Sequence, residues 1–254
     1  MHWDFALILL VLATLVPLLG RRRIRRLMEA ESTMKADRLV LYASTIAFQW
    51  VAVAIILWRT RAHGLSPTDL ALAIPKPGLA LITTILLSAL ILVNQIVALR
   101  RLREDPHSAT HGILPHLALK VFPQDAIEKL GFTALVSTVA ICEEVIYRGF
   151  AQRVFQDWAG VLGTGAAVVI GVIGAAVMFS LAHLYQGRRG LISTFVVGLL
   201  FSTVRVFTGS IVPASVAHFI ADIIAGFLAP GSLRRGLARM SEASATSELT
   251  SKTT

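Results

Sequence analysis

Two adjacent glutamates and an arginine stand inside one of the most apolar parts of the sequence. The stretch "VAICEEVIYRGF", residues 139–150, holds Glu143, Glu144 and Arg148. Charge is costly away from water, so ionisable residues within apolar segments usually have a function. On an α-helix Glu144 and Arg148 are i and i+4, which predicts an ion pair between them. Glu143 points about 100° away, so its carboxylate is free to serve as a general base or acid.

Two further apolar segments carry histidines. "FSLAH" contains Phe179 and His183, and "HFIAD" contains His218 and Asp222. One glutamate and two histidines can activate a water molecule, either directly or around a metal ion. Asp222 lies one helical turn beyond His218, so it can accept a ring proton and orient that histidine. The alternative is an internal charge cluster that only holds helices together.

The single cysteine, Cys142, is a second candidate nucleophile because it precedes the two glutamates. Adjacent carboxylates disfavour the thiolate that would be the reactive form. We therefore expect Cys142 to be a small buried residue. One cysteine also excludes an intrachain disulfide framework.

The surrounding elements are expected to be membrane-spanning helices. The chain has 254 residues, of which 55% are hydrophobic and 15% charged, whereas soluble domains carry about 25% charged residues. Crossing a bilayer takes about 20 apolar residues. We identify about seven such runs: 4–19, 39–58, 79–99, 126–146, 161–183, 191–207 and 211–229. The predicted fold class is all-α, a polytopic transmembrane helix bundle with a polar site inside the membrane.

The net charge of +9 is distributed as in a membrane protein. Arginine-rich stretches follow the first, third, fifth and last runs: 21–26, 100–103, 187–190 and 234–239. Alternate loops are thus basic, as expected for cytoplasmic loops. This predicts a multi-pass cell-membrane protein with its N-terminus outside and its C-terminus in the cytoplasm, and argues against a nucleic-acid partner. The first run lacks a basic region before it, so it is predicted to be a retained span rather than a cleaved signal.

The chain divides into four predicted parts. Residues 1–103 form a transmembrane scaffold without ionisable residues in mid-span. Residues 104–125 are expected to be a cytoplasmic connection with an interfacial helix around 113–121. Residues 126–230 form the helical core that carries the intramembrane charges, and 231–254 a basic and then disordered tail. Within the core the Gly- and Ala-rich segment 163–176 is expected to be a central helix, because small residues allow close packing in lipid.

The three motifs resemble those of the CPBP (CAAX protease and bacteriocin-processing, or Abi) intramembrane proteases. That family has EExxxR, then FxxxH, then HxxxN or HxxxD, and here the blocks occur in the same order over residues 119–230. The matching positions are Glu143, Glu144, Arg148, Phe179, His183, His218 and Asp222. The resemblance implies an intramembrane endopeptidase similar to CAAX prenyl proteases, acting on a peptide or membrane-protein substrate.

The resemblance also implies roles for these residues. Glu143 and His183 would activate water, His218 and Asp222 would stabilise the oxyanion, and the Glu144 ion pair would hold the geometry. Both a metal-free glutamate mechanism and a metalloprotease mechanism fit, and zinc would take Glu143, His183 and His218 as ligands. CAAX-cleaving relatives tend to have Asn where this sequence has Asp222. A carboxylate donates to an oxyanion only when protonated, so orientation of His218 or metal ligation suits Asp222 better.

Other functional classes remain open. A non-proteolytic membrane scaffold or bacteriocin-immunity protein of the same fold is the main alternative. A proton-coupled transporter also carries ionisable residues within its spans, but this sequence shows no internal repeat. The sequence leaves open the substrate, its prenylation and the oligomeric state.

Overall fold

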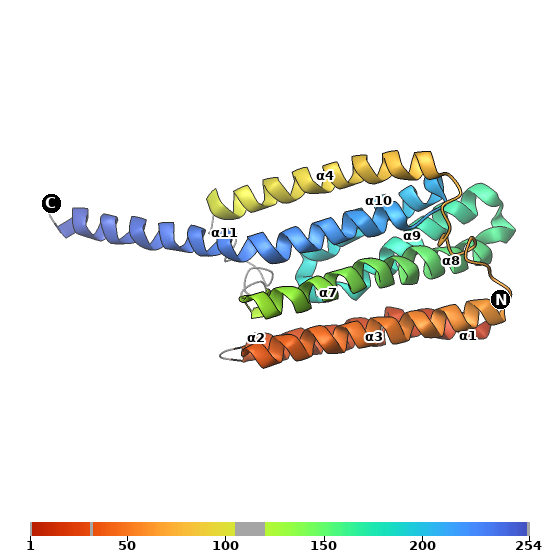
Figure 1. The fold of residues 1–254 in the computed structure, drawn as a ribbon, viewed down its shortest axis with the longest axis horizontal. Coiled ribbons are helices and arrows are strands. Elements are labelled where there is room, and N and C mark those ends of the chain that lie inside the picture. Colours follow the sequence, from red (N-terminus) through yellow and green to blue (C-terminus); the bar gives the residue numbers. More distant parts are fainter. Residues whose placement is uncertain (1, 31–32, 105–119, 253–254) are drawn as a thin grey trace.

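The computed structural model describes residues 2–30, 33–104 and 120–252, and over these the chain forms helices without a strand. In chain order the helices are α1 Trp3–Ala13, α2 Leu15–Glu29, α3 Lys35–Ala62, α4 Pro77–Glu104, α7 Ala126–Glu143, η1 Glu144–Ala151, α8 Gln152–Ala159, η2 Gly160–Leu162, α9 Thr164–Ala182, η3 Leu184–Gln186, α10 Gly187–Thr208 and α11 Val212–Lys252. The long helices lie nearly along one direction (Figure 1). Seven described helical segments are long and apolar enough to cross a membrane, which confirms the all-α bundle.

Two spans extend furthest beyond the apolar runs that predicted them. The first extends over Trp3–Glu29 and contains a break at Thr14 between α1 and α2. Pro17 explains the break, because proline has no N–H to bond to the carbonyl four residues earlier. The fourth extends over Ala126–Leu162, since the helix continues beyond the apolar run 126–146 through η1 and α8.

Two further predictions concern the connection between α4 and α7 and the C-terminal tail. The interfacial helix around 113–121 falls largely outside the described residues. We expect residues 231–254 to be a basic and then disordered tail, but α11 continues through Pro230 to Lys252. Leu, Ala, Arg and Glu recur in this stretch and are good helix formers, and that propensity outweighs the polar composition. The division into scaffold and core stays a prediction.

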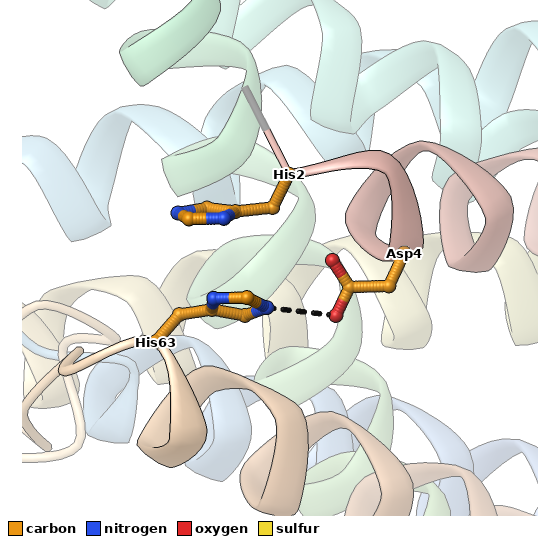
Figure 2. Close-up of side chains that lie close together, drawn as sticks. All are labelled: His2, Asp4 and His63. Atoms are coloured by element: carbon orange, nitrogen blue, oxygen red, sulfur yellow. Dashed lines mark hydrogen bonds and ion pairs between the residues drawn. The ribbon is translucent and has the colours of Figure 1, made fainter.

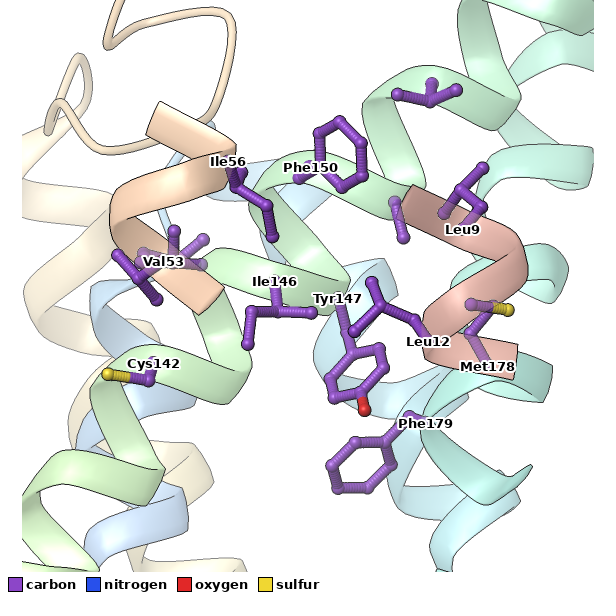
Figure 3. Close-up of a cluster of buried hydrophobic side chains, with 14 of the residues drawn as sticks. Leu9, Leu12, Val53, Ile56, Cys142, Ile146, Tyr147, Phe150, Met178 and Phe179 are labelled. Carbon is purple, nitrogen blue, oxygen red and sulfur yellow. The ribbon is translucent and has the colours of Figure 1, made fainter. Parts of the chain in front are cut away.

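A shared apolar core joins the N-terminal helices to the motif segment (Figure 3). Its labelled members come from α1, α3, α7, η1 and α9: Leu9, Leu12, Val53, Ile56, Cys142, Ile146, Tyr147, Phe150, Met178 and Phe179. Cys142 is a free, fully buried thiol in this cluster, as expected. The predicted scaffold therefore packs directly against the helix that carries the glutamates.

Helix α9 packs closely against several neighbours, but Val169, Ile173 and Val177 leave one of its faces exposed, so its predicted central position stays a prediction. It packs against α1, α2, η1, α8 and α10. A Cβ at Gly198 of α10 would lie 3.0 Å from the Cα atom of Ala176. A larger residue at either position would push the two helices apart.

Three of the four arginine-rich stretches lie at one end of the bundle. The C-terminal ends of α2 and α4 and the C-terminal part of α11 are on the same side in Figure 1, and α3 and α7 begin at this side. Arg38 near the start of α3 and Glu128 near the start of α7 form a buried ion pair. Three stretches that we expected in the cytoplasm thus share one end, and the orientation of that end stays a prediction.

At the opposite end, polar contacts join the start of α1 to the end of α3, and further polar contacts lie within the loop before α4. Asp4 Oδ2 accepts hydrogen bonds from Arg59 Nε at 2.8 Å and His63 Nε2 at 2.9 Å, and His2 stacks on His63 (Figure 2). In the loop, hydrogen bonds from Ser66 hold the pKa of Asp69 below its ordinary value. These contacts fix both the start of α1 and the end of α3.

The loop before α4 also packs against the motif segment. A Cβ at Gly149 would lie 3.0 Å from the Leu70 carbonyl oxygen. Arg153 Nη1, one turn later, donates to Asp69 Oδ1 at 2.6 Å. Glycine directly after Arg148 therefore permits this close approach of the loop.

Candidate active site

The glutamate motif passes from α7, which ends at Glu143, into a segment of π-helix, η1, where we expected an α-helix. All eight residues from Glu144 to Ala151 are buried. Such segments inside α-helices are frequent at functional sites. The predicted contact is present nevertheless: Arg148 Nη1 donates to Glu144 Oε1 at 2.7 Å, with both side chains fully buried.

Glu144 also holds one of the two histidines. His218 Nδ1 lies 3.0 Å from the same Oε1 atom that Arg148 contacts. On its other side, His218 Nε2 is 3.6 Å from Asp222 Oδ2, which is longer than an ordinary hydrogen bond. The orienting contact that we expected from Asp222 is therefore made by Glu144.

Glu143 is held by a residue outside the motifs. Gln49 Nε2 of α3 donates to Glu143 Oε1 at 3.1 Å. Glu143 Oε2 is buried and has no hydrogen-bond partner in the described part of the chain. Gln49 was not among the predicted site residues. A lone amide in the apolar run 39–58 is the signal that could have indicated it.

His183 caps the end of α9, and Phe179 packs beside it. His183 Nδ1 lies 2.8 Å from the Phe179 carbonyl oxygen, so Nδ1 carries the hydrogen and Nε2 is the acceptor of a neutral ring. The Phe179 ring centroid is 4.5 Å from that of His183 and 6.0 Å from that of His218. The guanidinium carbon of Arg148 lies 4.2 Å from the same Phe179 centroid. Phe179 thus packs against both histidines and the arginine.

These contacts bring together residues from all three motifs. Glu143 has no hydrogen bond to His183 or His218 among the described residues. The contacts that do join the motifs are those of Glu144 with Arg148 and His218, and those of the Phe179 ring. Direct convergence of Glu143 and the two histidines stays a prediction.

The predicted zinc ligands do not form a compact donor group. Among the described residues, the group whose potential ligand atoms lie within 4.8 Å of one another is His2, Asp4 and His63, at the end of the bundle (Figure 2). As positioned, Glu143, His183 and His218 do not fit a shared zinc ion, so we derive no catalytic step through one. Zinc binding stays a prediction of the sequence analysis.

Comparison with known families supports the resemblance. Residues 126–224, which contain all three motifs, match the family model described as type II CAAX prenyl endopeptidase Rce1-like. No curated protein matches the chain, and no solved structure matches it. The resemblance to CAAX-type proteases is confirmed over these residues. Together with the seven apolar helices, it indicates an integral, multi-pass membrane protein.

Proposed function

We propose that the protein is an intramembrane endopeptidase that hydrolyses a peptide bond with water activated by Glu143 and His183. The observation that carries the proposal is the state of the Glu143 carboxylate. Gln49 holds one oxygen, while the other is buried without a hydrogen-bond partner among the described residues. An anchored carboxylate with one free oxygen suits the acceptance of a proton from water. The family match over residues 126–224 supports the reaction class.

His183 supplies the second contact for the water. Its Nδ1 atom is engaged by the Phe179 carbonyl, so the lone pair on Nε2 is available to the nucleophile. In the proposed reaction Glu143 takes a proton as the water oxygen attacks the scissile carbonyl. It then passes that proton to the leaving nitrogen as the C–N bond breaks. Both products are thereby complete, one with a new carboxyl group and the other with a new amine.

His218 is proposed to stabilise the oxyanion. Glu144 holds Nδ1, and the Nε2 atom lies 3.6 Å from Asp222 Oδ2. A doubly protonated ring could donate from Nε2 to the developing negative charge, with Glu144 and Asp222 balancing the charge of the ring. Arg148 shares the same Glu144 oxygen and holds that carboxylate in place.

Comparing membrane proteins from cells with wild type or Glu143→Gln tests this function. We expect uncut substrate proteins to accumulate in the variant and their N- and C-terminal fragments to disappear. The alternative is a non-proteolytic scaffold or immunity protein of the same fold. It predicts unchanged fragments, together with a normal cellular phenotype for the variant. Synthetic peptides with and without a prenylated cysteine then distinguish the substrate class.

A further inference from the structure

A groove between α2 and α3 lies at the arginine-rich end of the bundle. It has a volume of about 650 Å³, and three arginines line it: Arg22, Arg23 and Arg26. Arg22 and Arg26 are i and i+4 on α2, so their guanidinium groups lie on one face, one turn apart. The groove is distinct from the candidate active site, and the inference below does not depend on the proposed function.

Two of these arginines are available to a ligand. The side chains of Arg22 and Arg26 have neither a hydrogen bond nor an ion pair within the described ranges, whereas Arg23 donates to the hydroxyls of Ser44 and Thr45 on α3. Arg23 therefore ties α2 to α3 at the groove. With respect to the described residues the guanidinium donors of Arg22 and Arg26 are free, and guanidinium groups suit phosphate oxygens.

The backbone around the groove adds positive character. Helix α3 begins beside it at Lys35, and the first turn of a helix carries a partial positive charge. The C-terminal end of α2 carries a partial negative charge on its free carbonyl groups. Lys120 offsets this charge, because its Nζ donates to the Leu27 and Met28 carbonyls at 3.0 and 2.9 Å. Asp37 also lines the groove, but its carboxylate accepts the Met34 backbone N–H.

Apolar side chains form the rest of the wall. Leu19 and Leu27 come from α2, and Val40 and Leu41 come from α3. Leu19 and Val40 are 48% and 65% exposed, so acyl chains can pack on them. A phosphate ion alone would gain nothing from this surface, whereas a phospholipid would use both the cationic and the apolar parts.

We propose that this groove binds the headgroup of an anionic phospholipid. Arg22 and Arg26 contact its phosphate, and the acyl chains lie along Leu19 and Val40. Basic pockets between transmembrane helices are suited to anionic headgroups. The occupant follows from charge complementarity and from the apolar wall on either side of the arginines.

The test is a titration of the full purified chain with lipid, in which native mass spectrometry measures the bound fraction. The probes are short-chain phosphatidylglycerol, phosphatidylcholine and inorganic phosphate. We expect phosphatidylglycerol to bind at least tenfold more tightly than either other probe. The double variant Arg22→Gln, Arg26→Gln should weaken its binding about 30-fold, since each arginine near the surface contributes a several-fold preference.

A matched control separates the groove from general surface charge. Arg21→Gln with Arg25→Gln removes the same charge from the same helix, and neither residue lines the groove. This variant should lose less than about threefold. Val40→Trp keeps every charge but fills the groove, so it should also weaken phosphatidylglycerol binding.

Three results would overturn the proposal. Equal losses in the two arginine double variants would show binding by overall charge. Phosphate binding as tight as lipid binding would show a simple anion site. Unchanged affinity in both the Arg22, Arg26 variant and Val40→Trp would place the lipid elsewhere.

Discussion

Two buried arginine–glutamate pairs lie in the described part of this bundle, at different depths. Arg38 and Glu128 join α3 to α7 at the arginine-rich end. Arg148 and Glu144 both belong to η1, near the middle of the candidate membrane span Ala126–Leu162. Both have an N···O distance of 2.7 Å, and both glutamate side chains are at most 1% exposed. By distance and burial the pairs are nearly the same.

The second oxygen of each glutamate distinguishes them. Glu128 Oε2 accepts the Gln124 backbone N–H at 2.7 Å. Glu144 Oε2 is buried without a hydrogen-bond partner among the described residues, and its Oε1 serves both Arg148 and His218. Leaving a buried polar atom unbonded costs about 1–3 kcal/mol. A pair that accepts this cost and holds a histidine is better explained by function than by stability.

The largest effect on activity is expected at Glu143, which directly precedes Glu144 of the second pair. Glu143→Gln should reduce peptide cleavage by about 10²–10⁴-fold, because it removes the general base. The yield of folded protein should stay normal, since the amide oxygen can still accept the Gln49 hydrogen bond. Cleavage by purified protein and the elution profile in detergent measure both. Normal turnover in this variant would remove Glu143 from the chemistry.

Arg38→Ala and Arg148→Ala should both destabilise the protein, by about 3–5 kcal/mol each, because each leaves an uncompensated buried carboxylate. Arg25→Ala is the control, because its pair with Glu29 is exposed and should contribute less than about 1 kcal/mol. Thermal unfolding in detergent measures all three. Stability of Arg148→Ala equal to that of Arg25→Ala would contradict the assignment of Arg148 to a buried ion pair.

Gln49→Ala should lower kcat about tenfold with little change in KM, because the Glu143 carboxylate would lose its anchor. Gln95→Ala is a matched control: Gln95 is another amide of the N-terminal part, and its Nε2 donates to the Ala221 carbonyl of α11 at 3.1 Å. It should leave kcat unchanged. Equal loss of kcat in both variants would indicate a general packing effect instead.

The smallest effect is expected at Asp222. Asp222→Asn should keep activity within about threefold, because Glu144 rather than Asp222 holds His218, and an amide adds a donor for the oxyanion. The assay is run with and without a chelator. Loss of activity that excess zinc restores would instead make Asp222 a metal ligand.

Much of the fold could be predicted because its signals are local. Apolar runs of bilayer length predicted seven spans, and the i, i+4 spacing predicted the contact between Glu144 and Arg148. The small residues of 163–176 predicted close helix packing, which Ala176 makes with Gly198 of α10. In each case a short window of sequence contains the whole physical argument.

The rest depends on packing between distant segments. Gln49 reaches Glu143 only because α3 packs against α7 and η1. His218 reaches Glu144 only because α11 packs against α7. The π-helical geometry of η1 has no comparable sequence signal. From helix spacing alone, Asp222 on the same helix is predicted to orient His218. The contact with Glu144 depends on the packing of two helices and has no such local signal.

The most direct test measures specific activity, per folded molecule, in Glu128→Gln and Glu144→Gln. Each variant leaves a buried arginine without its carboxylate, so both should lose similar stability. Folded Glu128→Gln should cleave peptide at the wild-type rate. Folded Glu144→Gln should lose most activity, because a neutral amide no longer balances the positive charge that the proposed mechanism places on the His218 ring. Full activity in folded Glu144→Gln would contradict the account.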